Sequence, residues 1–308
     1  MNNFIKYYSA LFIVISSLFI SHYASAAPLI ITMAGLQTNF NEYESLIAEH
    51  GKESLFKKGL PYDSPTNRVV SEMIIIMRAL KEGGLDAKIE YLSVPNARRE
   101  TLEVSNGHAV ICSQQFNKAT LQEDNFSETL LITDAITRLG EFEKGIYHLP
   151  DNHAFLNATN TREIKSFGTA IIGLHWNNDE RVLSKMKVNK IIHAPTYKSM
   201  FSMLKVGRGE WIPLEFPNTS DLSITAYGVK VVPVHGVKFS LLESRHFLVS
   251  KNHHHGQKVF DALQIGIKKL RKEGYIRKVL EQSGFFSTKT KSWRLLNEDQ
   301  ITNYKHTY

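Results

Sequence analysis

The sequence predicts a two-lobed α/β protein in which each lobe is an open, mostly parallel sheet flanked by helices. Strand-like and helix-like segments alternate twice along the chain, first within residues 29–112 and again within residues 167–234. This alternation is typical of parallel sheets covered by helices. No repeat, low-complexity linker or proline-rich hinge separates the two units. Chains that cross between lobes on strands often lack such a linker.

The clearest element of the first unit is a helix that follows Pro65-Thr66 and ends at Gly83-Gly84. The apolar residues that recur there at helical spacing are Val70, Met73, Met77 and Leu80. The segment 35–64 is polar and irregular, apart from a short helix expected around residues 43–48. The other expected elements are strands at 29–33, 88–94 and 109–112 and a short helix at 96–105.

The second unit repeats the alternation with shorter elements. Its expected strands lie at 167–174, 190–193 and 228–234, and its expected helices at 178–186 and 196–206. A basic amphipathic helix over 257–270 follows.

The N-terminus has the pattern of a secretory signal peptide, which we assign to residues 1–26. Lys6 precedes an apolar run over residues 9–20, and Ala24-Ser25-Ala26 supplies a small-residue cleavage site. The apolar run is shorter than the roughly 20 residues that a membrane-spanning helix needs, although an uncleaved anchor is the alternative. The expected location of the mature chain is the periplasm.

Charge and cysteine content narrow the class of protein. The formal net charge of +7 is a modest excess, and an exported protein does not meet nucleic acid. Cys112 is the only cysteine, so no internal disulfide can form, and we expect it to be a buried small hydrophobe. His253-His254-His255 are adjacent, whereas tetrahedral metal sites draw ligands from several elements. We expect no metal, no other cofactor and a monomer.

Several short segments, in this order, resemble a known family. They are Asn125-Phe126-Ser127-Glu128-Thr129, the helix end Leu204-Lys205-Val206-Gly207-Arg208, the returning segment 245–251, and the closing helix and turn over 267–285. Together they resemble family 3 of the bacterial extracellular solute-binding proteins, which have the type II periplasmic binding fold. The resemblance covers nearly the whole chain after the signal peptide. It implies that residues 28–134 plus 250–308 form lobe one, that residues 135–249 form lobe two, and that two crossing strands form the hinge.

The resemblance implies a protein that captures a small polar metabolite in a cleft between its lobes and presents it to a membrane permease. A ligand-sensing partner of a membrane signalling protein is the alternative. A dehydratase-like enzyme on the same fold is a third hypothesis, but no nucleophile–base pattern or metal spacing supports catalysis, so we expect no enzyme. Amino-acid-binding members carry an arginine about six residues before the Phe-Ser pair. In this chain, counting back six residues from Phe126 arrives at Thr120, so that arginine is missing from this position.

Candidate ligand-binding residues follow the ends of predicted strands, where open α/β sheets bind ligands. They are Arg98, Ser113, Gln114, His175, Trp176, Thr196 and Tyr197. Tyr62, in a turn, could stack on a ligand or pack the turn. Glu215 falls where the resemblance implies an acid for a ligand amine, or it faces solvent. The alternatives are a solvated helix cap for Arg98 and core packing between the lobes for His175 and Trp176.

Overall fold

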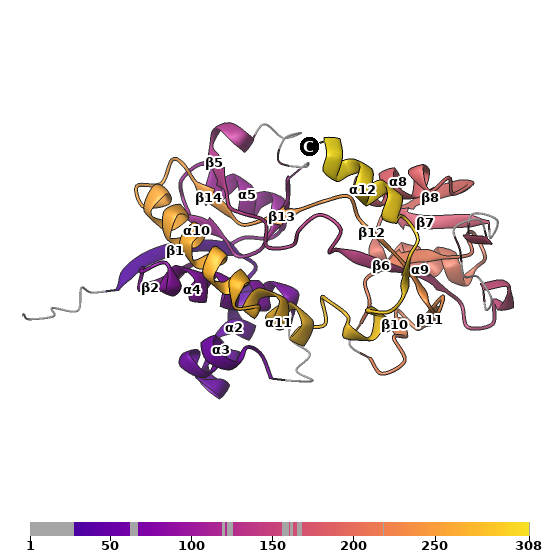
Figure 1. Cartoon of the computed structure of the whole chain (residues 1–308), viewed down its shortest axis with the longest axis horizontal. Coiled ribbons are helices and arrows are strands. Elements are labelled where there is room, and N and C mark those ends of the chain that lie inside the picture. The colour runs from indigo at the N-terminus through magenta and orange to yellow at the C-terminus, as the bar shows by residue number, and fades with distance from the viewer. Residues whose placement is uncertain are drawn as a thin grey trace, which may run out of the picture.

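The computed structural model describes residues 28–61, 67–118, 121, 126–155, 160, 163–164, 168–217 and 219–307. These residues form two lobes that lie side by side, joined by crossing segments near the middle of the molecule (Figure 1). The expected two-lobed α/β fold is therefore confirmed. The predicted signal peptide and Tyr62 lie outside the described residues. Within the described ranges, no helix is both long enough and apolar enough to cross a membrane.

Lobe one is built on a sheet with the strand order β2-β1-β3-β14-β5. Its strands are β1 (Leu29–Gly35), β2 (Ala87–Ser93), β3 (Ile111–Cys112), β5 (Leu130–Ile132) and β14 (Leu248–Ser250). β1 pairs in parallel with β2 and β3, as the alternating pattern predicts. β14 is antiparallel to both of its neighbours, because the chain returns to lobe one from the opposite direction.

Helices cover the sheet of lobe one. They are α2 (Gln37–His50), α3 (Lys52–Lys58), α4 (Arg68–Glu82), α5 (Ala97–Ser105), α10 (Gly256–Lys272) and α11 (Tyr275–Gln282). The segment that we expected to be mostly irregular forms α2 and α3. These two helices bury few side chains, among them Phe40 and Leu55, so their hydrophobic periodicity is weak in the sequence.

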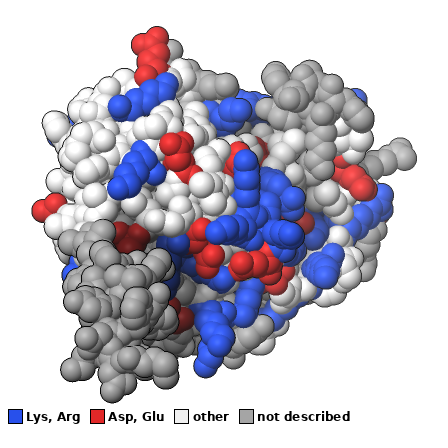
Figure 2. Space-filling view, turned by 60° about the vertical axis from the view of Figure 1, so that its left-hand side comes forward, with Lys and Arg blue, Asp and Glu red and all other residues white. Residues whose placement is uncertain are grey.

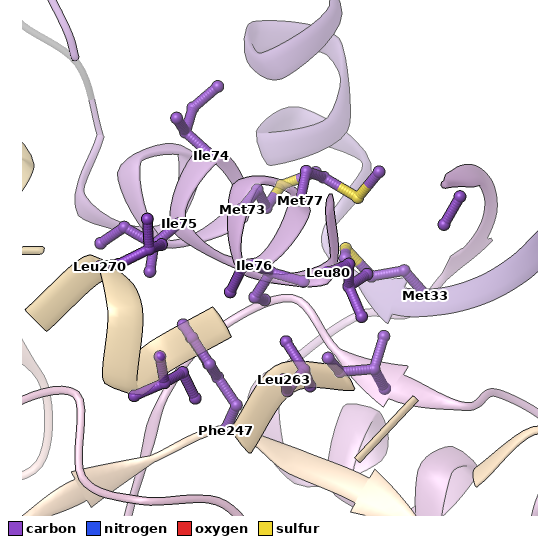
Figure 3. Close-up of a cluster of buried hydrophobic side chains, with 14 of the residues drawn as sticks. Met33, Met73, Ile74, Ile75, Ile76, Met77, Leu80, Phe247, Leu263 and Leu270 are labelled. Carbon is purple, nitrogen blue, oxygen red and sulfur yellow. The ribbon is translucent and has the colours of Figure 1, made fainter. Parts of the chain in front are cut away.

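α4 is the centre of the core of lobe one. Ile74, Ile75 and Ile76 are all fully buried, which means that neighbours cover this helix on every side. Figure 3 shows α4 above α10, with Leu263 and Leu270 of α10 facing it. A helix buried on all sides is apolar around its circumference, which explains the continuous run of isoleucines beside the helical spacing.

Lobe two is also built of strands and helices. Its strands are β6 (Glu143–His148), β7 (Thr169–Gly173), β8 (Lys190–Ala194), β9 (Ile212–Leu214), β10 (Ile224–Ala226), β11 (Val229–Pro233), β12 (Val237–Ser240) and β15 (Arg294–Leu295). Its helices are α8 (Asn177–Lys185), α9 (Tyr197–Lys205) and α12 (Glu298–Thr307). Short 3₁₀ turns occupy Phe126–Glu128, His153–Phe155 and Thr288–Thr290.

Strand directions in lobe two differ from the expected mostly parallel sheet. β7 and β8 are parallel, but β6 pairs antiparallel with β9, β11 and β12. β10 and β11 form a hairpin whose turn residues Tyr227 and Gly228 both have positive φ, as a tight two-residue hairpin turn requires. Hairpins of this kind join neighbouring strands without a helix and so produce antiparallel pairs.

Two segments cross between the lobes and meet at the middle of the molecule. β13 (Arg245–His246) pairs with β4 (Phe116–Asn117) of lobe one, and Arg245 forms an antiparallel bridge with Thr137 of the outgoing segment. The backbone nitrogen of Arg245 donates to the carbonyl of Thr137 over 2.8 Å. The crossing segments thus lie hydrogen-bonded to each other at the junction.

The end of the chain does not stay in lobe one, where we had placed residues 250–308. β15 pairs in parallel with β12, and the buried side chains of Trp293 and Ile301 join the hydrophobic clusters of lobe two. Asn297 fastens this segment, because its side chain bonds both the N–H and the carbonyl of Ser240. The chain therefore connects the two lobes a third time, after α11.

Positive side chains are frequent on the surface of lobe one. Figure 2 shows Lys and Arg side chains gathered on one face of the molecule, with acidic side chains beside them. α10 ends in Lys268, Lys269, Arg271 and Lys272. Ion pairs such as Arg78–Glu273 join neighbouring helices at this surface, so part of the positive charge is locally neutralised.

Candidate functional site

A cavity of about 730 Å³ lies between the lobes, a size usual for small-molecule sites. Lobe one contributes residues from α5 and β4, lobe two contributes β6, α8, α9 and the end of β9, and the returning crossing segment runs along the cavity. Its lining cations are Arg98, Lys144, Arg181 and Arg245, and its lining carboxylates are Asp179, Glu215 and Glu243. The site is therefore strongly polar and carries both signs of charge.

The structure brings together five of the residues that the sequence suggested. They are Arg98, His175, Trp176, Tyr197 and Glu215, and all of them line the cavity. Arg98 lies in the first turn of α5 after β2, and Trp176 immediately precedes α8 after β7. Tyr197 begins α9 after β8. Residues that follow strand ends in both lobes therefore line the same cavity.

Ser113 and Gln114 lie away from the cavity wall and contact a buried carboxylate instead. Ser113 donates to Oε1 of Glu100 from its backbone nitrogen over 2.6 Å and from its hydroxyl over 3.0 Å. Gln114 donates to Oε2 over 2.7 Å. Burial raises the pKa of the Glu100 carboxyl to about 7, although these hydrogen bonds favour its charged form. The two residues therefore brace the loop after β3, and we leave them out of the proposed site.

Thr196 also does not line the cavity and instead bonds to the backbone. Its hydroxyl accepts a hydrogen bond from the backbone nitrogen of Ser199 over 3.0 Å, which caps the start of α9. This cap positions the next residue, Tyr197, whose ring packs edge-on against Phe201. Burial and the nearby Glu215 raise the pKa of the Tyr197 hydroxyl to about 12. Tyr197 therefore enters the cavity as a neutral hydrogen-bonding group.

A buried ion pair forms part of the wall in lobe two. Lys144 of β6 and Asp179 of α8 approach to 2.6 Å, and each side chain is only 6% exposed. The Lys144 ammonium also lies 4.0 Å from the centre of the Trp176 ring. Burial raises the pKa of Asp179, an effect that Lys144 opposes. The pair holds β6, α8 and Trp176 in one fixed arrangement.

Glu243, on the returning segment, connects both lobes. Its Oε1 accepts from Nε of Arg245 over 2.8 Å. Its Oε2 accepts from Asn117 of lobe one over 2.8 Å and also from Asn178 of lobe two. The Arg245 guanidinium lies 4.9 Å from the ring of Phe142, which forms another part of the wall. Charged and aromatic groups therefore converge where the crossing segments meet.

A second network supports this junction from inside lobe one. The buried Glu72 accepts hydrogen bonds from Arg68 and from both the backbone and side chain of Gln115. Gln115 in turn accepts from the hydroxyl of Thr137 on the outgoing segment over 2.8 Å. Burial would lower the pKa of Arg68, but Glu72, Glu215 and Glu243 outweigh it, so the pKa is raised. Arg68 therefore adds a permanent positive charge near the cavity.

Sequence reasoning missed several lining residues, including Lys144, Glu243 and Arg245. These residues follow no predicted strand end, because they lie on β6 and on the returning segment. Cleft-facing and core-facing side chains alternate along such segments, and only the tertiary structure shows which ones face the cavity. The sequence feature that could have indicated this part of the wall is the close spacing of two opposite charges, Glu243 and Arg245.

The three adjacent histidines contact one another. The backbone nitrogen of His255 donates to Nδ1 of His253, and the three rings pack against one another. The described part of the chain contains no group of three or more His, Cys, Asp or Glu side chains placed to hold a metal ion. Cys112 is fully buried, and burial raises the pKa of its thiol.

Comparisons with known proteins support the fold. No family model and no curated protein matches the chain. Among solved structures, it is similar to the probable amino-acid ABC transporter extracellular-binding protein of Bacillus subtilis, with 13% identity over 83% of this chain and 97% of that one, at a TM-score of 0.54. It is also similar to the L-cystine solute receptor of Neisseria gonorrhoeae in its unliganded open conformation, with 15% identity over 84% and 93%, at a TM-score of 0.50. The chain therefore has the two-lobed fold of these solute-binding proteins.

Proposed function

We propose that this protein is an exported solute-binding protein. It captures a small polar metabolite in the interlobe cavity and presents it to a membrane transporter. The observation that carries the proposal is the cavity itself, whose charged and aromatic walls come from both lobes and from the crossing segments. A ligand that contacts both lobes favours the closed form by the difference between its contact energies in the closed and open forms.

The proposal includes the parts that accompany such a role. Residues 1–26 direct export to the periplasm. Residues 28–134 with α10 and α11 form lobe one, and residues 135–249 with the end of the chain form lobe two. Arg98, His175, Trp176, Tyr197 and Glu215 contact the ligand. The similar protein of Bacillus subtilis is a probable amino-acid ABC transporter extracellular-binding protein and that of Neisseria gonorrhoeae is an L-cystine solute receptor, which supports a permease as the partner. The protein acts without catalysis and as a monomer.

A thermal-shift screen tests binding. The purified protein is heated with amino acids, polyamines, organic acids and small peptides, and a specific ligand raises the melting temperature in a concentration-dependent way. The Arg98→Ala variant is expected to lose this shift while its ligand-free melting temperature stays unchanged. Arg98 is exposed and has no ion pair among the described residues, so its removal costs little stability.

Arg99→Ala is the matched control for this experiment. Arg99 is the next residue of α5, but it pairs with Glu103 and does not line the cavity. We expect the ligand-induced shift to survive in this variant. An equal shift in the wild type and in Arg98→Ala would remove Arg98 from the site. The absence of a shift with every compound class would contradict the proposed function.

The identity of the membrane partner is tested separately. A ligand-sensing role shares the cavity and the closure but delivers the closed form to a signalling protein. Neighbouring genes for a permease and an ATPase would favour transport, and a neighbouring gene for a membrane signalling protein would favour sensing. Catalysis would require turnover of an organic acid that disappears in Glu215→Gln, because Glu215 is the exposed carboxylate of the cavity.

A further inference from the structure

The backbone of Arg245 is fixed at the junction of the lobes. Its nitrogen donates to Thr137, and its carbonyl accepts from Ile136 over 2.8 Å, so it is bound to the outgoing segment on both sides. β13, which contains Arg245, also pairs with β4 of lobe one. The backbone of Arg245 therefore has a fixed position at the wall of the cavity.

The guanidinium of Arg245 has a fixed direction, but not all of its hydrogen-bond donors are used. Its Nε donates to Glu243, and its plane lies near the Phe142 ring, which together fix the direction of the side chain. Only 20% of the side chain is exposed, and the residue lines the cavity. Among the residues that the structure describes, none accepts a hydrogen bond from its two terminal nitrogens. These nitrogens form the fork that binds a carboxylate through two parallel hydrogen bonds.

The other cations of the cavity are less suited to this task. Lys144 is engaged by Asp179 and by the Trp176 ring, and Arg181 donates to Asn178. Arg98 has no hydrogen-bond or ion-pair partner within the described ranges, but it is exposed in the first turn of α5, where water screens its charge and its side chain must be ordered on binding. Arg245 combines open donors with prior orientation, so it loses less conformational entropy when it binds an anion.

We propose that Arg245 is the residue that receives the carboxylate of the ligand. This inference rests on the proposed function and adds both the chemical class of the ligand and its anchor. Glu243 engages Arg245 at Nε, and its other oxygen accepts from Asn117 and Asn178, so the two terminal nitrogens of Arg245 stay open toward the cavity. A carboxylate on Arg245 therefore sits beside the acid that ties both lobes to the returning segment.

Calorimetric titrations test the inference with acid and amide pairs. The probes are the common L-amino acids, L-cystine and succinate, each beside the amide made from the same acid. For an acid that binds the wild type, Arg245→Lys is expected to raise Kd at least tenfold, because it keeps the charge and removes the fork. The amide is expected to bind the wild type at least tenfold more weakly than the acid, with little further loss in Arg245→Lys.

Arg138→Lys is the matched control, since Arg138 lies on the outgoing segment, pairs with Glu141 and does not line the cavity. It should leave Kd unchanged. Arg245→Gln is the second variant if Arg245→Lys does not fold, as judged by its ligand-free melting temperature. An unchanged Kd in the Arg245 variants, or an equal loss for acid and amide, would overturn the inference while leaving the proposed function intact. If the wild type binds none of the acids or amides, both fail.

Discussion

At the scale of single residues, Glu100 shows how a carboxylate can serve the site without touching a ligand. It lies two positions after Arg98 on α5 and is fully buried. Its oxygens hold Ser113 and Gln114, which begin the loop that leads to Asn117 in the cavity wall. A glutamate in a short polar helix is ordinarily solvated, so the sequence offered no sign of this position.

The raised pKa of Glu100 predicts a pH dependence of stability. Between about pH 4.5 and 7 the folded protein binds a proton that the unfolded chain has released, so the free energy of unfolding falls as pH rises through this window. The expected fall is about 3 kcal/mol. Urea denaturation of the wild type and of Glu100→Gln across this range measures it.

The Glu100→Gln variant serves as the comparison because it removes the titrating group and keeps the side-chain size. Its unfolding free energy should lack this component, so that the difference between the two proteins changes with pH. Parallel stability curves from pH 4.5 to 8 would show that folding does not shift the pKa of Glu100 and would contradict this prediction.

At the scale of elements, the contact between α4 and α10 depends on two glycines. A Cβ added at Gly266 of α10 would lie 1.9 Å from the carbonyl oxygen of Ala79, and one added at Gly83 would lie 2.0 Å from that of Ala262. The two helices therefore approach so closely that backbone meets backbone at both points. The apolar periodicity of the sequence predicted both helices, but it did not indicate how closely they pack.

Gly266→Ala is expected to destabilise the protein by about 1–3 kcal/mol, because the helices must separate to accept the methyl group. The better helix propensity of alanine offsets up to about 1 kcal/mol of this cost. Chemical denaturation measures the change. Ile265→Ala is the control in the same helix, since Ile265 is half exposed and makes fewer contacts. Equal stability of Gly266→Ala and the wild type would contradict this account of the interface.

At the scale of the whole molecule, the chain connects the lobes at three places. The outgoing and returning segments meet at Arg245, and the C-terminal segment passes from α11 to β15. The third connection holds lobe two through the fully buried Asn297. We expect a hinge rotation about these segments to move the lobes relative to each other and to leave both cores intact.

Ligand binding is expected to make the molecule more compact. A compact chain of this length has a radius of gyration of about 19 Å, and closure of the cavity should move the measured value toward it. Small-angle scattering with and without a carboxylate identified by the thermal-shift screen checks this. Arg245→Lys should keep the ligand-free value at the same ligand concentration. A radius that does not change in the wild type at saturation would argue against hinge closure.

The sequence by itself determined the two-lobed fold, most helix and strand positions in the first unit, and the strand-end residues Arg98, Trp176 and Tyr197. The helix and strand positions and the strand-end residues follow from local periodicity and from the general geometry of open α/β sheets, whereas the two-lobed arrangement follows from the resemblance to solute-binding proteins. Only the tertiary structure decided the antiparallel pairing in lobe two, the attachment of the C-terminus there, and the cavity-facing Lys144, Glu243 and Arg245. The reason is that those features depend on contacts between segments far apart in the chain, which short-range patterns do not encode.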